Sequence, residues 1–114
     1  MATAAGGPFQ YEVAKSTDDI GNAVTTITCH GRLVSETSSA MRGLVSPLIP
    51  AGGRIVLDLS DLSYLDSSGL GTLVGLKVSA IKQGYCRLEL VNVAPNILKL
   101  LRMTNLAQLL TSQS

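Results

Sequence analysis

The spacing of apolar residues predicts that the chain opens with two strands. In residues 9–15 the large apolar side chains of Phe9, Tyr11 and Val13 occupy alternate positions, and the alternation returns in residues 23–30, which are rich in Val, Thr and Ile. A period of two is typical of a strand with one buried face. Residues 17–19 interrupt the pattern, so we expect the two strands to pair antiparallel across a loop, with residues 31–34 closing the second strand.

The apolar positions that follow are spaced first for a helix and then for a buried strand. Ser35 is expected to be the helix N-cap, Met41 and Val45 fall on one stripe, and Pro47 ends the helix. Residues 54–59 form a nearly continuous apolar run after two glycines. This run predicts a central strand that is covered on both faces.

A longer helix is predicted from Ser67 to a stop at Gly84. Its apolar residues recur every three or four positions, while Thr72 and Lys77 fall largely on the opposite side. The side expected to face the sheet carries Leu70, Leu73, Val74, Val78 and Ile81.

The remaining sequence predicts one more strand and one more helix. Residues 87–93 have the composition of a strand, and Pro95 is favoured at the first position of a helix that Asn105 can end. Residues 107–110 are a candidate for a short last strand. The inward side of the helix is expected to hold Ile97, Leu100 and Leu101.

This order of elements predicts an α/β fold, a mixed sheet of four to five strands with helices packed on it. Strand-helix-strand units favour parallel neighbours, and the opening pair adds an antiparallel edge. A chain of 114 residues can bury one core, so we divide it into a flexible N-terminus, residues 1–8, and a single domain, residues 9–111. Met41 and Met103 lie at helical spacing with other apolar residues and are expected in the core.

Composition and charge argue against several classes of protein. Nine Lys and Arg against eight Asp and Glu give a net charge of +1 without a basic run, so no nucleic-acid partner is expected. No apolar stretch approaches the roughly 18 residues that span a bilayer, and residues 1–7 lack the features of a secretory signal. We therefore expect a cytoplasmic protein without membrane insertion. Cys29 and Cys86 are isolated and are predicted to be buried, reduced thiols without a metal.

Catalysis is not predicted. His30 has no second His and no obvious acidic partner, which favours a histidine at the surface or at a strand end over a general base. Ser67 lacks the G-x-S-x-G frame of serine hydrolases, and the glycines match neither a P-loop nor a dinucleotide fingerprint. We expect a protein that is not an enzyme and that holds no cofactor.

The informative segment is Asp66-Ser67-Ser68-Gly69-Leu70-Gly71, which joins the central strand to the long helix. It places two hydroxyls, an acid and two glycines where free backbone N–H groups and the positive end of the helix dipole can receive negative charge. A phosphoryl group would be favoured there, although the neighbouring acid would repel it. Taken alone, the segment is explained better by a helix cap at Asp66 or Ser67 and by close helix packing at the glycines. Two glycines in one turn still need a reason, because each costs ~1 kcal/mol relative to Ala.

The run from Ile55 to Gly71 closely resembles the signature of the anti-sigma factor antagonists, the bacterial members of the STAS domain family. Gly31-Arg32-Leu33 resembles the glycine-x-leucine that ends the family's second strand, and Pro95 to Leu106 resembles its last helix. The likeness covers nearly the whole chain. It implies a STAS-type fold, a small mixed sheet with helices.

The resemblance also implies a partner-switching cycle. The unphosphorylated protein would bind an anti-sigma factor that is also a serine kinase, with ATP bound by that partner, and so release a sigma factor. Phosphorylation of Ser67 would end the complex, and a PP2C-type phosphatase would reset it. Ser68 is a competing acceptor. The residues expected to contact the partner or kinase are Asp66, Ser68, Gly69, Leu70 and Gly71.

Three features of the sequence allow more than one interpretation. Many antagonists carry an acidic residue where this chain has Val34, which affects how a kinase would recognise the site. The same surface could instead be a structural contact in a STAS accessory module of a transporter or larger signalling assembly. We expect the leucine-rich carboxyl end to fold back on the sheet, with an apolar contact to a partner or to a second copy as the alternative. Its extra leucines are Leu98, Leu106, Leu109 and Leu110.

Overall fold

The computed structural model describes residues 9–104 and contains one four-stranded sheet, in the order β1-β2-β3-β4. β1 and β2 are antiparallel, and the other neighbouring pairs are parallel. This confirms the predicted mixed α/β fold. The elements are β1 (Gln10–Thr17), β2 (Ala23–Leu33), α1 (Ser35–Val45), a short 3-10 helix (Ser46–Leu48), β3 (Gly53–Leu65), α2 (Ser67–Gln83), β4 (Cys86–Val91) and α3 (Pro95–Met103). The predictions for residues 1–8, for Asn105 and for the strand and leucines beyond it lie outside the described residues.

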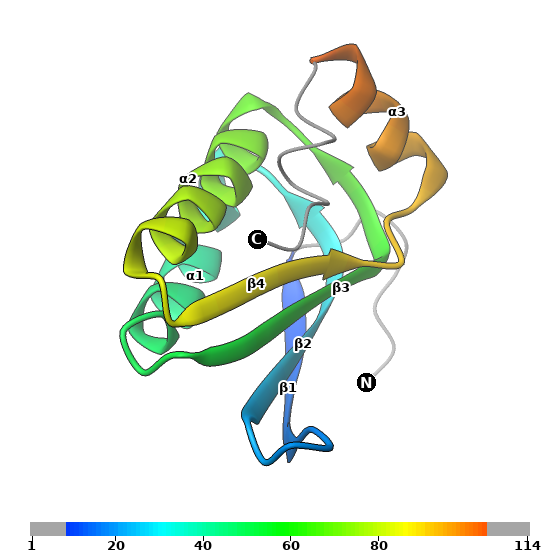
Figure 1. Cartoon of the computed structure of the whole chain (residues 1–114). Helices are drawn as coiled ribbons and strands as arrows, with labels where there is room; N and C mark the ends of the chain where they lie inside the picture. The colour runs from blue at the N-terminus through cyan, green and yellow to red at the C-terminus, as the bar shows by residue number, and fades with distance from the viewer. Residues whose placement is uncertain (1–8, 105–114) are drawn as a thin grey trace.

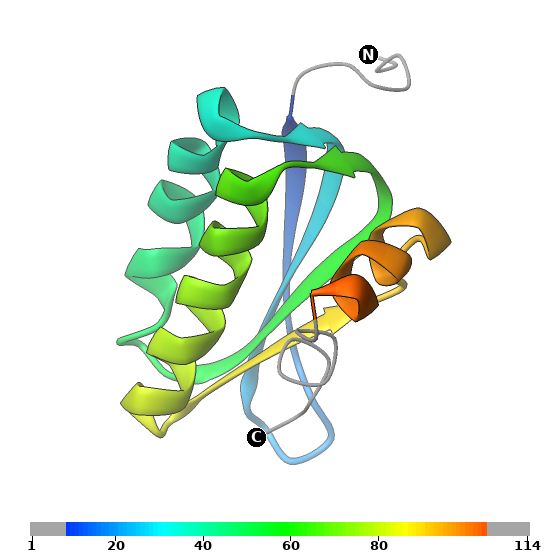
Figure 2. The same cartoon turned by 90° about the horizontal axis from the view of Figure 1, so that it is seen from above.

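Helices cover both faces of the sheet. α1 and α2 lie side by side on one face, and α3 lies on the other (Figures 1 and 2). The core contains a row of register partners from three strands, Ile27, Leu57 and Leu90, each at most 7% exposed. The prediction that β3 is a central strand covered on both faces is therefore confirmed, since α3 also packs against β3.

β3 is longer than the apolar run predicts. It continues past Leu59 to Leu65, and the pairing with β2 shifts register twice on the way. Each shift places one extra residue in β3, as a β-bulge does, so that Leu59, Leu62 and Leu65 are all buried although they are three residues apart. A spacing of three is not a strand period, and for that reason the prediction of a strand ending at residue 59 was wrong.

The buried side of α2 also differs from the prediction. Val78 and Ile81 are 37% and 43% exposed, whereas Thr72 and Lys77, predicted to lie outside, are 5% and 1% exposed. α2 packs against both α1 and β4, which widens its buried side and leaves Val78 and Ile81 beyond it. Lys77 is tolerated inside because its Nζ donates to the carbonyl of Leu88 at 2.6 Å, and burial lowers the pKa of this amine.

Val34, not Ser35, is the N-cap of α1. Its backbone N–H donates to the hydroxyl of Thr37 at 3.0 Å, while Ser35 is already the first helical residue. The prediction of a Ser35 cap was therefore wrong by one residue. The extended backbone at Val34 lets the chain leave β2 and turn directly into the helix.

The remaining predictions concern the two cysteines, the last described strand, the two methionines and Leu100. Cys29 and Cys86 are buried free thiols, as predicted, and the strand predicted at residues 87–93 runs from Cys86 to Val91. Met41 is fully buried, but Met103 is 72% exposed, because it lies in the last turn of α3 on the side away from Ile97 and Leu101. Leu100, predicted to face inward, is only half-buried.

Candidate functional site

The segment at the end of β3 lies where two helices begin. The last residues of β2 and β3, Leu33 and Leu65, are register partners. α1 and α2 therefore start beside each other at the carboxyl ends of these two strands. The N–H of Asp66 donates to the carbonyl of Leu33 at 3.3 Å and links the two junctions. Because helix N-termini carry free N–H groups and the positive end of the helix dipole, this end of the sheet favours negative charge.

Asp66 caps α2 and also holds α1. Its Oδ1 accepts a hydrogen bond from the N–H of Gly69 at 2.9 Å, and its Oδ2 accepts one from the N–H of Ser35 at 3.2 Å. The interpretation of this acid as a helix cap is thereby confirmed. Both carboxylate oxygens are engaged by backbone donors, so the side chain of Asp66 has a fixed direction at the start of the two helices.

Ser67 and Ser68 are the first two residues of α2, and both are exposed. Within the described part of the chain, neither hydroxyl makes a hydrogen bond. The two serines differ in their surroundings: Ser68 lines a groove between α1 and α2, whereas Ser67 does not. Ser67 is thus exposed outside the groove, whereas Ser68 is exposed at its lining.

The two glycines of the segment have different roles. A Cβ at Gly69 would collide with the carbonyl oxygen of Leu33, so this residue must be glycine for α2 to start so close to β2. A Cβ at Gly71 would meet nothing within 4 Å. Leu70 is half-buried against the core. The exposed members of the segment are therefore Ser67, Ser68 and Gly71.

The groove between α1 and α2 was not predicted from the sequence. It has a volume of about 460 Å³, and Gly71 and Gly75, one turn apart on α2, form part of its wall. A Cβ at Gly75 would also meet nothing within 4 Å. Arg42 is the one charged residue of the lining, and the other lining residues are Ser46, Ser68, Thr72, Leu76 and Ser79. The sequence signal for this groove was the four-residue spacing of Gly71, Gly75 and Ser79.

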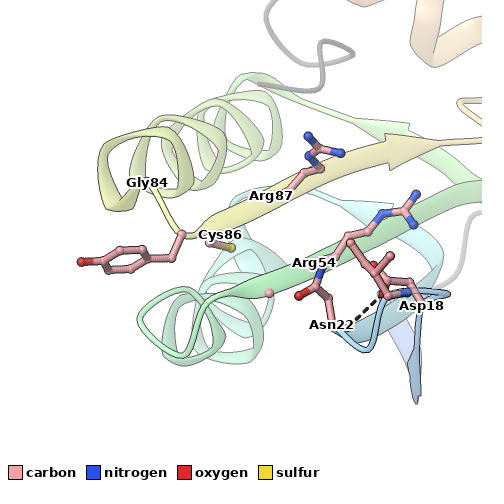
Figure 3. Close-up of a pocket in the computed structure, with 9 residues that line it drawn as sticks. Asp18, Asn22, Arg54, Gly84, Cys86 and Arg87 are labelled. Carbon is pink, nitrogen blue, oxygen red and sulfur yellow. Dashed lines mark hydrogen bonds between the residues drawn. The ribbon is translucent and has the colours of Figure 1, made fainter.

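A second cavity, of about 530 Å³, lies at the opposite end of the sheet, where β3 and β4 begin (Figure 3). Arg54 and Arg87 extend from neighbouring strands beside it. Arg54 donates twice to Oε1 of the buried Glu89, at 2.7 and 3.1 Å, and Nε of Arg87 is 4.0 Å from Oε2 of the same carboxylate. Asp18 accepts from the N–H groups of Ile20 and Asn22, which lowers its pKa. Oε2 of Glu89 is buried without a hydrogen-bond partner among the described residues. This cavity nevertheless contains no residue of the segment from Asp66 to Gly71, so it is the weaker candidate.

His30 has acidic neighbours that the sequence did not reveal. Its Nδ1 is 2.6 Å from Oδ2 of Asp61, and its Nε2 is 3.8 Å from Oε2 of Glu12. The prediction that His30 lacks an acidic partner was wrong, because the register shift in β3 brings Asp61 opposite His30. The three side chains come from β1, β2 and β3, so they connect neighbouring strands.

Neither a metal nor a membrane is suggested by residues 9–104. No group of three or more His, Cys, Asp or Glu side chains among them could hold a metal ion. No helix in that part of the chain is long and apolar enough to cross a membrane.

Comparisons with known proteins find a matching family model, a relative with a similar sequence and solved structures with a similar fold. A family model described as "Mlab, STAS domain" matches residues 16–111. The anti-sigma-B factor antagonist of Bacillus subtilis (strain 168) is 31% identical over 80 residues, which cover 70% of this chain and 72% of that protein.

Two solved structures share the fold at low sequence identity. The anti-sigma factor antagonist SpoIIAA in its unphosphorylated form is 21% identical, with a TM-score of 0.65 over 89% of this chain and 88% of that one. The murine anion transporter Slc26a9, in its inward-facing state, is 18% identical, with a TM-score of 0.63 over 84% of this chain but only 18% of the transporter chain. The same fold thus occurs both as a small protein and as part of a transporter.

Proposed function

Because this chain belongs to the STAS domain family, we propose that it is an anti-sigma factor antagonist that is switched by phosphorylation of Ser67. The unphosphorylated protein binds a kinase-type anti-sigma factor and so releases a sigma factor. The observation that carries this proposal is the exposed Ser67 hydroxyl at the start of α2, in a segment that resembles the family's phosphorylation motif. The relative that is 31% identical, an anti-sigma-B factor antagonist, supports it.

In this cycle the chain is a substrate and a ligand, not a catalyst. The oxygen of Ser67 attacks the γ-phosphorus of ATP held by the partner, and a new O–P bond forms while the bond to the leaving ADP breaks. The hydroxyl proton passes to a base of the kinase. A PP2C-type phosphatase later hydrolyses the phosphoserine and restores the hydroxyl. The chain itself needs to supply only an accessible, unpartnered hydroxyl.

The new phosphate would act through charge. The phosphate adds a charge of about −1.5 to −2 at the helix starts, where Asp66 already carries a negative charge. Glu36 lies nearby, in the first turn of α1. The N–H groups at the helix start stabilise the phosphate, but Asp66 is fixed by its bonds to Gly69 and Ser35 and cannot turn away without breaking them. We expect the surface at the two helix starts to become strongly anionic without refolding. A partner that binds there through an anionic surface should then dissociate.

The groove beside Ser68 extends the surface offered to the partner. Gly71 and Gly75 lie inside a helix, where each costs ~1 kcal/mol relative to Ala, and contacts within residues 9–104 do not require a glycine at either position. A close approach by another chain would explain both. Arg42 in the lining then offers a cation to an acidic side chain of the partner.

The decisive experiment incubates the protein with its kinase-type anti-sigma factor and ATP. The native chain and Ser68→Ala should each gain the mass of one phosphate, and Ser67→Ala should gain none. Ser67→Asp should weaken the complex at least about tenfold, whereas Ser39→Asp, an exposed control on α1, should leave it unchanged. Phosphate on the Ser67→Ala variant, or equal binding by both Asp variants, would contradict the proposal.

A second candidate function is favoured by one observation, the likeness of this fold to part of an anion transporter. In that case the chain is an accessory module of a transporter or larger signalling assembly, and the surface around Ser67 is a permanent contact with that assembly. Purification of the tagged chain from membranes would distinguish the two functions. A stable complex with transporter subunits that is unaffected by Ser67→Asp would favour this second candidate.

A further inference from the structure

β1 is an edge strand that lacks several of the features that usually protect such an edge. It pairs with β2 over all eight residues, Gln10–Thr17, in unbroken register. No described strand pairs with its other side. Natural edges are shielded by Pro, bulges, short length or several charges. This strand has no Pro and no bulge, and its charged residues are one of each sign, Glu12 and Lys15. Its outer backbone groups between Tyr11 and Thr17 are placed to accept another strand.

The side chains of β1 leave an apolar row unfinished. Tyr11 and Val13 are register partners of Cys29 and Ile27 on β2, and both of these partners are fully buried. Tyr11 and Val13 themselves are 46% and 43% exposed. The row of buried residues that crosses the sheet therefore ends in two large, exposed apolar side chains at the edge. Another strand beside β1 would cover them.

We propose that this edge pairs with β1 of a second copy of the chain, antiparallel and centred on Val13. A twofold axis normal to the sheet relates two such strands, so every residue lies opposite one that points to the same face. In this register Val13 lies opposite Val13 of the second copy, and Tyr11 lies opposite Lys15. The ring of Tyr11 can then contact both the aliphatic part and the ammonium group of the lysine.

Charge and length favour this register over its neighbours. Pairing centred on Glu12 or on Lys15 places two like charges directly opposite each other, which is destabilising. Pairing centred on Tyr11 joins only three residues of the strand, because β1 begins at Gln10. Pairing centred on Ala14 keeps the length but leaves no large apolar residue opposite another. The Val13 register alone combines length, apolar contact and unopposed charges.

The resulting dimer has an eight-stranded sheet and leaves the proposed phosphorylation site free. Ser67 follows β3, and β2 separates β3 from the new interface. Because the two central strands run antiparallel, the two copies of Ser67 lie toward opposite ends of the joined sheet. Dimerisation and partner binding are therefore independent of each other in this arrangement.

Single cysteines test both the pairing and its register in a Cys29→Ala background, because Cys29 lies opposite Tyr11 on β2 and could bond to a cysteine placed there. The other native thiol, Cys86, is buried on β4. Under mild oxidation of the full chain, Val13→Cys should cross-link to itself, and a mixture of Tyr11→Cys with Lys15→Cys should give the mixed dimer. Lys15→Cys alone should not cross-link. Self-linkage through position 15, or a mixed dimer of Val13→Cys with Lys15→Cys in place of these products, would overturn the register.

Analytical ultracentrifugation of the native chain tests the dimer itself. The mass should rise with concentration toward twice the chain mass of 11.9 kDa. Val13→Lys, which places two lysines opposite each other, should raise the dimer dissociation constant at least about tenfold. Ile20→Lys, a change at a turn residue that is 83% exposed and lies outside the strand, should not. A native chain that stays monomeric, or equal effects of the two lysine variants, would overturn the proposal.

Discussion

Gly69 and Gly71 lie two residues apart in the same helix, but their surroundings are opposite. The backbone of β2 leaves no room for a side chain at Gly69, whereas the space beside Gly71 is open. The sequence offered two explanations for these glycines, close packing and approach by a partner. The structure assigns close packing to Gly69 and leaves partner approach as the proposal for Gly71.

Alanine at the two positions should therefore change stability in opposite directions. Gly69→Ala should lower the free energy of unfolding by about 3 kcal/mol, because the new methyl group displaces either α2 or the end of β2. Gly71→Ala should raise it by up to about 1 kcal/mol through helix propensity. Urea unfolding followed by circular dichroism measures both values. A loss of stability at Gly71 equal to that at Gly69 would mean that the open space is not present in solution.

At the scale of elements, α2 joins the proposed switch to the core. Its first turn holds Asp66 and Ser67, and its middle inserts Lys77 between the helix and β4, where the amine donates to Leu88. A buried lysine is less stable in its charged form, which is why the pKa of Lys77 is lowered. The helix that presents the proposed phosphorylation site is thus held against the sheet partly by a titratable group.

The lowered pKa of Lys77 predicts a definite dependence of stability on pH. The unfolded chain, with an ordinary lysine pKa near 10.5, binds a proton that the folded chain has already lost in the interval between the two pKa values. Stability relative to a Lys77→Met variant should therefore rise as the pH increases through the folded pKa toward 10.5.

Chemical unfolding of the native chain and Lys77→Met at several pH values measures this difference. Lys82→Met, at an exposed position of the same helix, is the matched control and should show no such trend. A difference between the native chain and Lys77→Met that stays constant up to the pH where both unfold would show that the amine is solvated in the folded protein.

For the whole molecule, the core that spans the sheet and the helices controls access to its thiols. Cys29 is fully buried, and burial raises its pKa to about 12, with the charge of Asp58 as a smaller cause. Burial also raises the pKa of Cys86. The thiolate is the reactive form of cysteine, so burial and the raised pKa both slow the reaction of these thiols with reagents in water.

A thiol-specific disulfide reagent at pH 8 should therefore label Cys29 only as fast as the folded chain opens. The rate should be at least a hundredfold below that of the unfolded chain, and a destabilising change such as Gly69→Ala should raise it. The absorbance of the released thiolate follows the reaction. Rapid labelling of Cys29 in the folded state would contradict the fully buried position.

The sequence by itself determined the order of the elements, the mixed sheet and the segment in which the candidate site lies. These features follow from local patterns: the two-residue period of β1 and β2, the three- and four-residue spacing in α2, and the polar junction at Asp66 and Ser67. Local backbone geometry converts each pattern into an element, so no knowledge of distant residues is needed.

Only the tertiary structure decided the features that depend on pairing between distant residues. The register shifts in β3 bury Leu62 and Leu65 and bring Asp61 to His30. The contact between two helix starts requires Gly69 and engages both oxygens of Asp66. Apart from the local bond between Gly69 and Asp66, each of these facts is a contact between residues more than 30 positions apart, and the spacing of residues along the chain does not contain such contacts.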